Sequence, residues 1–285
     1  MNKVKIGFIG QGFVGKNYAD DFVARGYKVI RYAKEKPYDK NKETIKDCDI
    51  VFIAVPTPTT SKGYDASIIR TVLSSTGVGK IVVLKSTILP GLTEDIQEEF
   101  PDRIILNSPE FLSEATASYD ASHPFVNIVG MAKETSRHKK AAKLVHSILP
   151  KAPKSLTVKS IEAEIIKYSH NCSGYTQIIF FNLAYDLSQK MGANWKSIEE
   201  AIKADPFIPN RYASPLHKSG RGAGGHCFIK DFAAFREIYE KVVSDPIGVS
   251  VLKSMEKKNI ELLNSSGKDA EILEGVYNRY KDAKE

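Results

Sequence analysis

The sequence is poor in cysteine and lacks any long hydrophobic run. Three cysteines occur in 285 residues and no two form a C-x-x-C pair, which argues against a disulfide framework or a structural zinc site. No apolar stretch approaches the roughly 20 residues that a membrane-spanning helix needs. Glycines interrupt the N-terminal segment MNKVKIGFIGQG too early for a secretory signal peptide. We therefore expect a cytoplasmic protein with no metal site and no membrane partner.

A nucleic-acid signature is also missing. Lys and Arg total 41 against 34 Asp and Glu, but the basic residues are scattered and no aromatic residues are interleaved with them. We expect most of them on solvated helix faces, with the excess charge able to attract small anions such as phosphates. A composition of 42% hydrophobic and 26% charged residues is ordinary for a soluble globular protein, and the length favours two domains.

What the sequence does contain is a phosphate-binding pattern near its start. The apolar run 4–9 is followed by Gly10-Gln-Gly12-Phe-Val-Gly15 and then by a helical pattern that reaches Arg25. In this strand–turn–helix setting Gly10 permits a tight turn, Gly12 lets a pyrophosphate approach the backbone, and Gly15 lets the helix pack on the strand. The amides at the helix N-terminus then face the phosphates. The motif predicts dinucleotide binding.

Further short apolar runs follow at the spacing of βαβ units. They lie at 27–32, 50–55, 80–85, 103–107 and 125–129, with a last one at 154–158. The alternation predicts an α/β fold in which an N-terminal doubly wound, Rossmann-type parallel sheet precedes an all-α domain built on a long central helix. We place the dinucleotide-binding domain at residues 1–160 and a helical dimerisation domain at 161–285.

Three polar loops follow consecutive strands and are expected at one edge of the sheet. They are PTPTT (56–60), STILPG (86–91) and SPEFLSEA (108–115). Ligands of such sheets bind beyond the carboxyl ends of the strands. Glu110 and Glu114 are four residues apart, so one helical turn would direct both carboxylates the same way.

The residues after the second strand depart from the usual NAD pattern. A ribose-binding acid is expected near position 33, where the chain has Ala33 followed by Lys34 and Glu35. Either Glu35 takes that role from a shifted loop, or the 2′-hydroxyl has no carboxylate partner. Arg31 or Lys34 could instead accept a 2′-phosphate, so NAD is favoured but NADP stays open.

A run with few helix breakers extends from Ile161 to about Met191. Glu164, Lys167 and Asn171 fall on one stripe of this helix, at spacings i, i+3 and i+7. The stripe is either exposed to solvent or directed inward toward a ligand or polar partners, because burying these groups unpaired is costly. A helix of this length also suggests a dimer interface.

The glycine-rich segment 219–226 is expected to be a loop whose backbone approaches another group. Cys227 follows it, and a helix is predicted from about Asp231. If the intervening turn is helical, Cys227 and Asp231 share a face. A thiol near a helix N-terminus and a lysine ionises readily, so Cys227 is the candidate reactive cysteine, whereas Cys48 and Cys172 are expected in the core. Two ordinary helices are predicted at 246–264 and 269–282.

Six of these segments together resemble the UDP-glucose/GDP-mannose dehydrogenase family. They are GFIGQGFVG, VFIAVPTP, KSTILPG, SPEFLSEA, EAEIIKYSHNCSGYTQIIFFN and GGHCFIKD, in family order from one end of the chain to the other. The resemblance implies a nucleotide-sugar 6-dehydrogenase that oxidises a primary alcohol to a carboxylate and reduces two NAD+. It also implies a role in nucleotide-sugar metabolism and polysaccharide biosynthesis.

The resemblance implies specific roles around the cysteine. Cys227 is expected to capture the intermediate aldehyde as a thiohemiacetal, which hydride transfer converts to a thioester. Lys167 and Asn171 are expected to stabilise the developing oxyanion, and such donors contribute roughly 3–4 kcal/mol. Asp231 is expected to position water or assist proton transfer.

Three further catalytic residues follow from the same resemblance. Glu114 is expected to act as acid and base through thioester hydrolysis, with Glu110 nearby, and Thr87 is expected to orient a water. The expected cofactor-binding residues are Gly10, Gly12, Phe13, Val14, Gly15, Lys34, Pro56, Thr57, Thr87 and Glu114. The expected substrate-binding residues are Glu110, Phe111, Leu112, Lys167, Asn171, Tyr212, Gly224 and Gly225.

The chain departs from the family pattern at three places. Ile229 stands where the family has a proline before Lys230, and Phe207 aligns with a substrate-binding arginine, for which Arg211 is a candidate replacement. Family members also carry a third, C-terminal α/β domain that helps to hold the nucleotide base, which the 285 residues do not include. We therefore expect a short form, either self-sufficient or completed by a separate chain.

Three functions remain open from the sequence. The first is a nucleotide-sugar dehydrogenase, most simply of UDP-glucose, that forms a homodimer through the long helix. The second is a catalytically weak NAD-binding protein with a regulatory or assembly role. The third is a dehydrogenase of a smaller or different sugar substrate.

Overall fold

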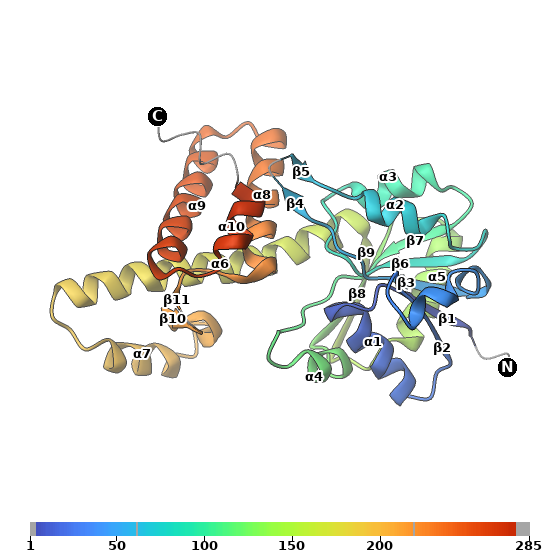
Figure 1. Cartoon of the computed structure of the whole chain (residues 1–285), viewed down its shortest axis with the longest axis horizontal. Helices are drawn as coiled ribbons and strands as arrows, with labels where there is room; N and C mark the ends of the chain where they lie inside the picture. The colour runs from blue at the N-terminus through green and yellow to red at the C-terminus, as the bar shows by residue number, and fades with distance from the viewer. Residues whose placement is uncertain (1–3, 61, 219, 278–285) are drawn as a thin grey trace. The chain divides into compact units, whose positions relative to one another are not determined.

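A computed structural model describes residues 4–60, 62–218 and 220–277 of the chain. These residues form two compact units (Figure 1). The first unit runs to Thr57 and then from Asp65 to Lys167; the second comprises Pro58–Tyr64 and the chain from Tyr168 onward. The division falls inside helix α6 (Ser160–Lys190), whereas the sequence placed the domain boundary at the start of that helix.

The first unit is built on a seven-stranded sheet with strand order β2-β1-β3-β6-β7-β8-β9. Its strands are β1 (Ile6–Ile9), β2 (Val29–Tyr32), β3 (Ile50–Ile53), β6 (Ile81–Leu84), β7 (Ile104–Asn107), β8 (Val126–Met131) and β9 (Lys154–Lys159). All seven lie where the sequence predicted strands. The order reverses between β1 and β3, and such a switch point is where ligands of open α/β sheets bind.

One pairing differs from the prediction of a wholly parallel sheet. β7 and β8 run antiparallel, with Leu106 opposite Met131, whereas β8 and β9 are parallel to each other. The other neighbouring pairs are parallel. The apolar pattern of a strand does not encode its direction, which depends here on how the chain crosses from β7 through the short helix α4 (Ala117–Ser122) to β8.

Helices cover both faces of this sheet (Figure 1). Alternate strand residues such as Phe8 and Phe52 point to one face and pack against α1 (Phe13–Ala24), α4 and α5 (Ser136–Ile148). Their neighbours, such as Val51 and Val82, pack on the other face against α2 (Ser67–Leu73) and α3 (Leu92–Glu99). Strands buried on both faces read as unbroken apolar runs, which explains why the sequence located them well. Two 3₁₀ turns, η1 (Tyr38–Asn41) and η2 (Ile45–Asp47), connect β2 to β3.

The second unit is mainly helical. It contains the larger part of α6 and the elements α7 (Trp195–Ala204), η3 (Asn210–Tyr212), α8 (Gly225–Val242), α9 (Pro246–Ser266) and α10 (Ala270–Tyr277). Two short antiparallel hairpins join it, β4 (Thr59–Thr60) with β5 (Gly63–Tyr64) and β10 (Leu216–His217) with β11 (Gly220–Arg221). Local signals bound α9: Asp245 caps its start ahead of Pro246, and Gly267 ends it with φ +65°. The last residues of the predicted helix 269–282 lie outside the described residues.

Aromatic packing connects the helices of the second unit. The rings of Tyr175 on α6 and Phe232 on α8 stack with their centroids 3.8 Å apart, and both side chains are fully buried. α8 also packs against α9, α10 and β4. The first turn of α8, which carries Cys227, is thereby attached to a rigid helical support.

Candidate functional site

The three glycines of the N-terminal motif have different surroundings, which explain why glycine stands at each position. Gly10 has φ +89°, and a Cβ there would lie 2.2 Å from the carbonyl oxygen of Ala54 at the end of β3. A Cβ on Gly15 would lie 2.0 Å from the carbonyl oxygen of Gly10. Nothing lies within 4 Å of the corresponding position on Gly12. Gly10 and Gly15 are therefore required by the fold, whereas Gly12 leaves open space at the helix start.

The N-terminus of α1 suits an anionic ligand. Gly12 is the N-cap and offers no side chain to the first-turn amides, and this turn contains no acidic residue. Phe13 is exposed, while Val14 packs against the core of the sheet. First-turn amides that no side chain caps, together with the positive end of the helix dipole, attract phosphate groups. The turn thus fits the pyrophosphate of a dinucleotide cofactor.

The loops after β3 and β6 are hydrogen bonded to each other. The amide of Val55 donates to Ser86 Oγ (3.0 Å), and the buried Thr57 hydroxyl donates to the carbonyl oxygen of Thr87 (3.0 Å). Pro56, between them in the chain, is exposed. These bonds bring two of the three predicted loops together beside the glycine turn.

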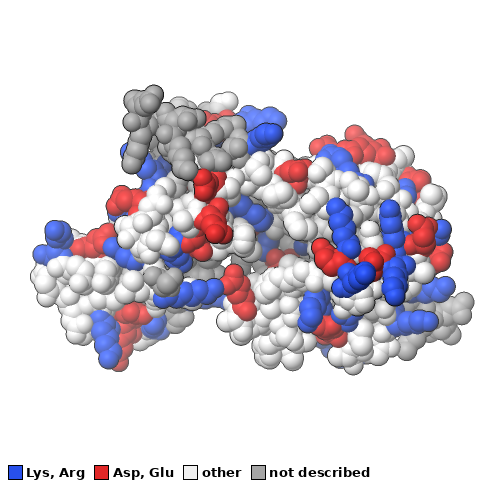
Figure 2. Space-filling view, viewed as in Figure 1, with Lys and Arg blue, Asp and Glu red and all other residues white. Residues whose placement is uncertain are grey.

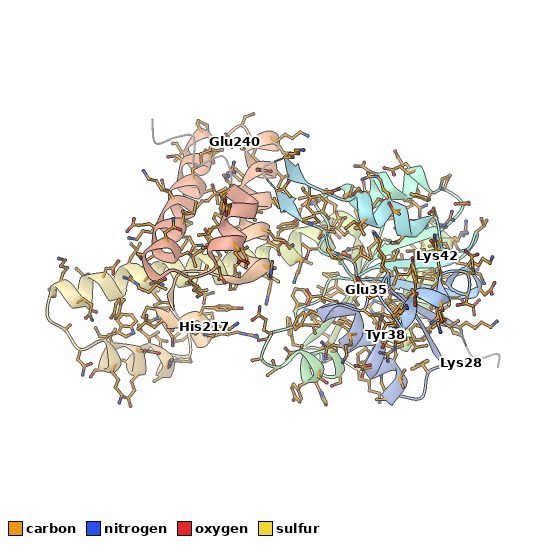
Figure 3. All side chains as sticks on the ribbon, in the orientation of Figure 1. Lys28, Glu35, Tyr38, Lys42, His217 and Glu240 are labelled. Atoms are coloured by element: carbon orange, nitrogen blue, oxygen red, sulfur yellow. The ribbon has the colours of Figure 1, made fainter. Side chains whose placement is uncertain are left out.

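The segment after β2 contains Glu35, the candidate ribose-binding acid, and Lys34, a candidate cation for a 2′-phosphate. Ala33 is buried, and Lys34 and Glu35 are exposed (Glu35 is labelled in Figure 3). Arg31 donates from Nη1 to Asp20 Oδ1 on α1 (2.6 Å), so its guanidinium is already paired. Of the two candidate cations for a 2′-phosphate, Lys34 is therefore the more available.

Glu110 and Lys167 form a buried ion pair in the first unit. Lys167 Nζ donates to Glu110 Oε1 (2.9 Å) and to the Glu110 carbonyl oxygen (2.7 Å). The Leu112 amide donates to the other carboxylate oxygen (2.7 Å), and Phe111 places its ring 5.5 Å from the ammonium. Burial alone would raise the pKa of Glu110, but Lys167, the Leu112 amide and Lys85 hold it below its usual range. The lysine is thus fixed in position by an ionised acid.

Lys85 is a charged residue of this cluster that the sequence reasoning missed. It follows β6, is almost fully buried, donates to Ser108 Oγ (3.3 Å) and lies 4.1 Å from the ring centre of Tyr18 on α1. Burial lowers the pKa of Lys85 to about 7; nearby Glu110 opposes this shift and Lys167 adds to it. A lysine directly after the apolar run IVVL was the available signal, because a strand buried on both faces ends at the ligand edge of the sheet.

The prediction that a helical turn aligns Glu110 with Glu114 was wrong. Residues 108–113 are not helical, and α4 begins only at Ala117. Glu110 is buried, whereas Glu114 is exposed. The Glu110 carboxylate accepts the Leu112 amide two residues ahead, which holds the backbone in a turn that competes with a helix.

The stripe on α6 is buried rather than exposed. Glu164, Lys167 and Asn171 keep 1%, 5% and 7% of their accessible surface. Glu164 accepts the amides of Gly91 (2.7 Å) and Thr93 (3.0 Å) and also the Thr93 hydroxyl. Its carboxylate therefore caps α3, whose own N-cap Gly91 has no side chain. Burial raises the pKa of Glu164, although these hydrogen bonds oppose the shift.

Asn171 belongs to a polar cluster within the second unit. Its Nδ2 donates to Asp231 Oδ2 (2.6 Å), and Lys230 is paired with the other oxygen of the same carboxylate. Asp231 is almost fully buried. The two residues that the sequence associated with Cys227 on this side are thus in direct contact, with the aspartate held between an amide and an ammonium.

Cys227 lies in the first turn of α8 and is exposed. The helix begins at Gly225, six residues before the predicted start, so Cys227 and Asp231 are indeed one helical turn apart. The other two cysteines are buried as predicted, and burial raises the pKa of Cys48 to about 11 and that of Cys172 to about 12. Among the three thiols, only Cys227 combines exposure with a helix N-terminus, the position that favours a thiolate.

The glycine-rich segment before Cys227 is less irregular than predicted. Gly220 and Arg221 form strand β11, and Gly225 and His226 already belong to α8; Ser219 lies outside the described residues. A Cβ on Gly224 would lie 2.0 Å from Asp269 Oδ2. The backbone here approaches another part of the same chain.

The remaining predicted positions of the second unit have clear surroundings. The Tyr212 ring packs edge-on against Phe228, and both rings contact the Gly174 position of α6. Ile229, in place of the family proline, is fully buried against α9 and α10. Phe207 and Arg211 are both exposed.

The predicted site residues thus form two groups, one in each unit. Lys167 and Asn171 are one turn apart on α6, but the first belongs to the cluster of Glu110 and the second to that of Asp231. The described residues contain no group of three His, Cys, Asp or Glu side chains suited to a metal ion. None of the described helices is long and apolar enough to cross a membrane. On the face shown in Figure 2, Lys and Arg are interspersed with Asp and Glu.

Comparison with known proteins places these features in a family. Residues 34–149 match the model for the UDP-glucose/GDP-mannose dehydrogenase family, NAD binding domain, and residues 161–261 match the central domain of the same family. The UDP-glucose 6-dehydrogenase of Rickettsia prowazekii is 29% identical over 242 residues, covering 81% of this chain and 54% of the relative. A putative UDP-glucose 6-dehydrogenase of Bacillus subtilis, YtcA, is 31% identical over 208 residues, covering 68% and 47%. The chain therefore spans about half the length of these curated relatives.

A solved structure has the same fold. The UDP-glucose dehydrogenase of Pyrobaculum islandicum superposes with a TM-score of 0.77 at 24% identity, over 91% of this chain and 68% of that one. Two family models matched in order, together with the glycine turn and the cysteine-bearing helix, lead to one conclusion: the chain belongs to the UDP-glucose/GDP-mannose dehydrogenase family.

Proposed function

We propose that the chain is a nucleotide-sugar 6-dehydrogenase, with UDP-glucose as its first candidate substrate and UDP-glucuronate as the product. The reaction oxidises the C6 primary alcohol by four electrons. One alcohol, two NAD+ and one water give one carboxylate, two NADH and three protons. Family membership and the names of the relatives support this proposal.

The cofactor would be held by the turn at Gly10–Gly15, the loops carrying Pro56, Thr57 and Thr87, and the segment at Lys34. When bound, NAD+ supplies a hydride acceptor for both oxidation steps. The first-turn amides of α1 bind its pyrophosphate, and the open space at Gly12 permits the close approach. NAD is the expected cofactor, and the exposed Lys34 leaves NADP to be tested directly.

Cys227 carries the covalent step. After the first oxidation its sulfur adds to the aldehyde carbon, and the carbonyl oxygen takes up a proton to form a thiohemiacetal. Loss of hydride from that carbon and of the hydroxyl proton gives a thioester. Water then displaces the sulfur and releases the carboxylate. Covalent capture keeps the reactive aldehyde bound while the cofactor is exchanged.

The remaining residues supply charge and proton transfer. Lys167 and Asn171 donate to the developing oxyanion, and Glu110 keeps the ammonium of Lys167 in place. Asp231, held by Asn171, assists proton transfer near the sulfur. Glu114 acts as acid and base during thioester hydrolysis, with Thr87 orienting the water.

One observation supports the mechanism above the others. Cys227 is the exposed thiol of the three, stands in the first turn of an 18-residue helix, and has the buried Asp231–Asn171 pair one turn behind it. A cysteine that served only to pack the core would resemble Cys48 or Cys172.

The test follows absorbance at 340 nm with NAD+ or NADP+ and three substrates: UDP-glucose, GDP-mannose and UDP-N-acetylmannosamine. We expect two NADH per sugar with one of them and loss of this stoichiometry in Cys227→Ala, while the variant still binds NAD+. Cys172→Ala is the matched control, because it removes a buried thiol. If none of the three sugars is turned over, smaller primary alcohols are assayed in the same way, and their turnover would change the substrate assignment. NAD+ binding without turnover of any of these substrates would instead favour a cofactor-binding regulatory or assembly protein.

We also propose a homodimer formed through α6. Its C-terminal half exposes the apolar side chains of Phe180, Leu183 and Leu187 at helical spacing, and the exposed Met191 directly follows the helix. Light scattering should give twice the 31.6 kDa chain mass for the wild type and a monomer for Leu187→Glu. A separate chain that contributes to binding the nucleotide base would be detected as a fall in the KM for the sugar on its addition.

A further inference from the structure

Three glycines before Cys227 are required by a neighbouring helix corner. We define the α9–α10 corner as Asn259, Ser266, Lys268 and Asp269. A Cβ on Gly220 would lie 2.6 Å from Ser266 Oγ, and one on Gly224 would meet Asp269 at 2.0 Å. Gly222 has φ +88°, and a Cβ added to it would lie 3.0 Å from Asn259 Oδ1. The glycines therefore let this segment lie directly against the α9–α10 corner.

Asn259 binds both backbone polar groups of one residue of the segment, Ala223. The Ala223 amide donates to Asn259 Oδ1 (2.7 Å), and Asn259 Nδ2 donates to the Ala223 carbonyl oxygen (3.0 Å). Both residues are almost fully buried. Removing this side chain would leave a buried donor and a buried acceptor without partners, which such groups avoid. The pairing fixes where Ala223 lies, four residues before Cys227.

The rest of the α9–α10 corner holds the residues on either side. The Arg221 amide donates to Ser266 Oγ (3.0 Å), and Lys268 Nζ donates to the Gly222 carbonyl oxygen (3.0 Å). The Gly225 amide donates to Asp269 Oδ2 (2.7 Å). Because Gly225 is the first residue of α8 and Gly224 is an N-cap without a side chain, Asp269 caps this helix from another element.

We propose that the α9–α10 corner is a positioning device for Cys227. Asn259 and Asp269 act through the backbone of residues 223 and 225 and do not touch the substrate themselves. They determine where α8 begins, and Cys227 is the third residue of that helix. This inference rests on the proposed role of Cys227 as nucleophile. A displacement of about 1 Å at a reacting group can lower the rate about 100-fold. Loss of the hydrogen bonds from the α9–α10 corner should therefore lower kcat.

The first test compares substitutions at Asn259. Asn259→Leu removes both hydrogen bonds at similar size, and Asn259→Asp keeps the acceptor but opposes a carboxylate oxygen to the Ala223 carbonyl. Both should lower kcat with the sugar by about 10- to 100-fold, while the KM for NAD+ stays within about twofold, because the dinucleotide turn is in the other unit. Asn264→Leu, at an exposed position of the same helix, is the matched control and should leave both parameters unchanged.

The second test uses the cap. Asp269→Asn retains an acceptor for the Gly225 amide and should keep most of the wild-type kcat, whereas Asp269→Ala should lose about 10-fold. Asp245→Ala, which removes the N-cap of α9 without touching the segment, should destabilise the protein comparably but leave kcat unchanged. If Asp269→Ala and Asp245→Ala lower kcat equally, the α9–α10 corner contributes only to overall stability, and the proposal is wrong.

A readout without turnover separates this inference from the proposed function. Amide hydrogen exchange at Ala223 should accelerate at least about 10-fold in Asn259→Leu, while exchange in the buried part of α6 is unchanged. An unchanged exchange rate at Ala223 in Asn259→Leu would show that Asn259 does not hold this residue, whatever the chain catalyses. Accelerated exchange with normal kcat would refute the positioning role alone. Normal activity of Cys227→Ala would refute the proposed function and this inference with it.

Discussion

Helices α1 and α8 both begin at a glycine N-cap, but their N-termini are used in opposite ways. At α1, Gly12 leaves the first-turn amides uncapped, with open space at its Cβ position. At α8, the carboxylate of Asp269 occupies the corresponding place. α3 resembles α8, since Glu164 caps it from α6. A glycine at a helix start therefore does not by itself indicate a phosphate site; what decides is whether another part of the chain supplies an anion.

Opening the capped end of α3 should have the largest effect on stability. Glu164→Ala leaves the amides of Gly91 and Thr93 and the Thr93 hydroxyl without their buried acceptor, so we expect a loss of about 3 kcal/mol in the free energy of unfolding. Glu164→Gln keeps one acceptor oxygen and should lose about half as much. Urea denaturation measures both. A loss below about 1 kcal/mol in the alanine variant would show that the cap contributes little.

Closing the open end of α1 should abolish cofactor binding without harming the fold. Gly12 has extended backbone angles, so Gly12→Asp can place a carboxylate on the first-turn amides and stabilise the helix by about 0.5–1 kcal/mol. The same carboxylate repels a pyrophosphate, and we expect at least about 100-fold weaker NAD+ binding by calorimetry, or about 2.7 kcal/mol. Gly12→Asn, which caps without charge, is the control. Retained NAD+ affinity in Gly12→Asp would move the binding site away from this turn.

The buried ammonium of Lys85, which lies over the Tyr18 ring of α1, predicts a pH dependence of stability. The folded-state pKa of Lys85 is about 7, below the 10.5 of a free lysine, so the unfolded chain binds more protons between these values. The free energy of unfolding should therefore rise with pH, by up to about 1.4 kcal/mol per unit, relative to Lys85→Met. Above about pH 10.5 Lys85 does not lower the free energy of unfolding through its charge, and below about pH 7 the full cost of burying the ammonium is present. Parallel pH profiles for the two proteins would show that Lys85 is not desolvated.

The smallest expected effect concerns cofactor choice beside α1. Asp20 on α1 pairs with Arg31 at the end of the second strand. Asp20→Asn removes this pairing charge and should make Arg31 available to a 2′-phosphate, shifting the ratio of NADP+ to NAD+ affinity about threefold toward NADP+. Lys16→Gln, which removes the other partner of Asp20, is the control and should shift it less. If this affinity ratio does not change in Asp20→Asn, Lys34 rather than Arg31 would be the residue that determines the choice between NAD+ and NADP+.

The parts of the fold that the sequence located are those with a local cause. The apolar runs of β1, β3, β6 and β7 identified strands because these strands are buried on both faces. The direction of β8 was missed, since no local pattern encodes it. The start of α8 was placed six residues late because a first turn containing glycine has poor intrinsic helix propensity, and the bond from the Gly225 amide to the distant Asp269 leaves no local sequence signal.

The site shows the same division. The sequence correctly grouped Cys227 with Asp231, and the i, i+4 spacing places them on one face once the turn is helical. It wrongly grouped Glu110 with Glu114, because the side chain of Glu110 stabilises a turn instead. Lys85 was missed although its position directly after the apolar run of β6 was a signal; its low pKa also depends on packing against Tyr18, which is far away in the chain.

By itself the sequence determined the order of strands and helices and the glycine turn before α1, and it singled out Cys227 as the candidate reactive cysteine, because glycine freedom and side-chain periodicity act over a few residues. Tertiary structure decided which helix ends are closed and which buried charges are paired. The partners concerned are far apart in the chain, 44 residues for Gly225 and Asp269 and 73 for Gly91 and Glu164. Such pairs exist only after packing has removed water and brought a carboxylate to an amide that has no other acceptor.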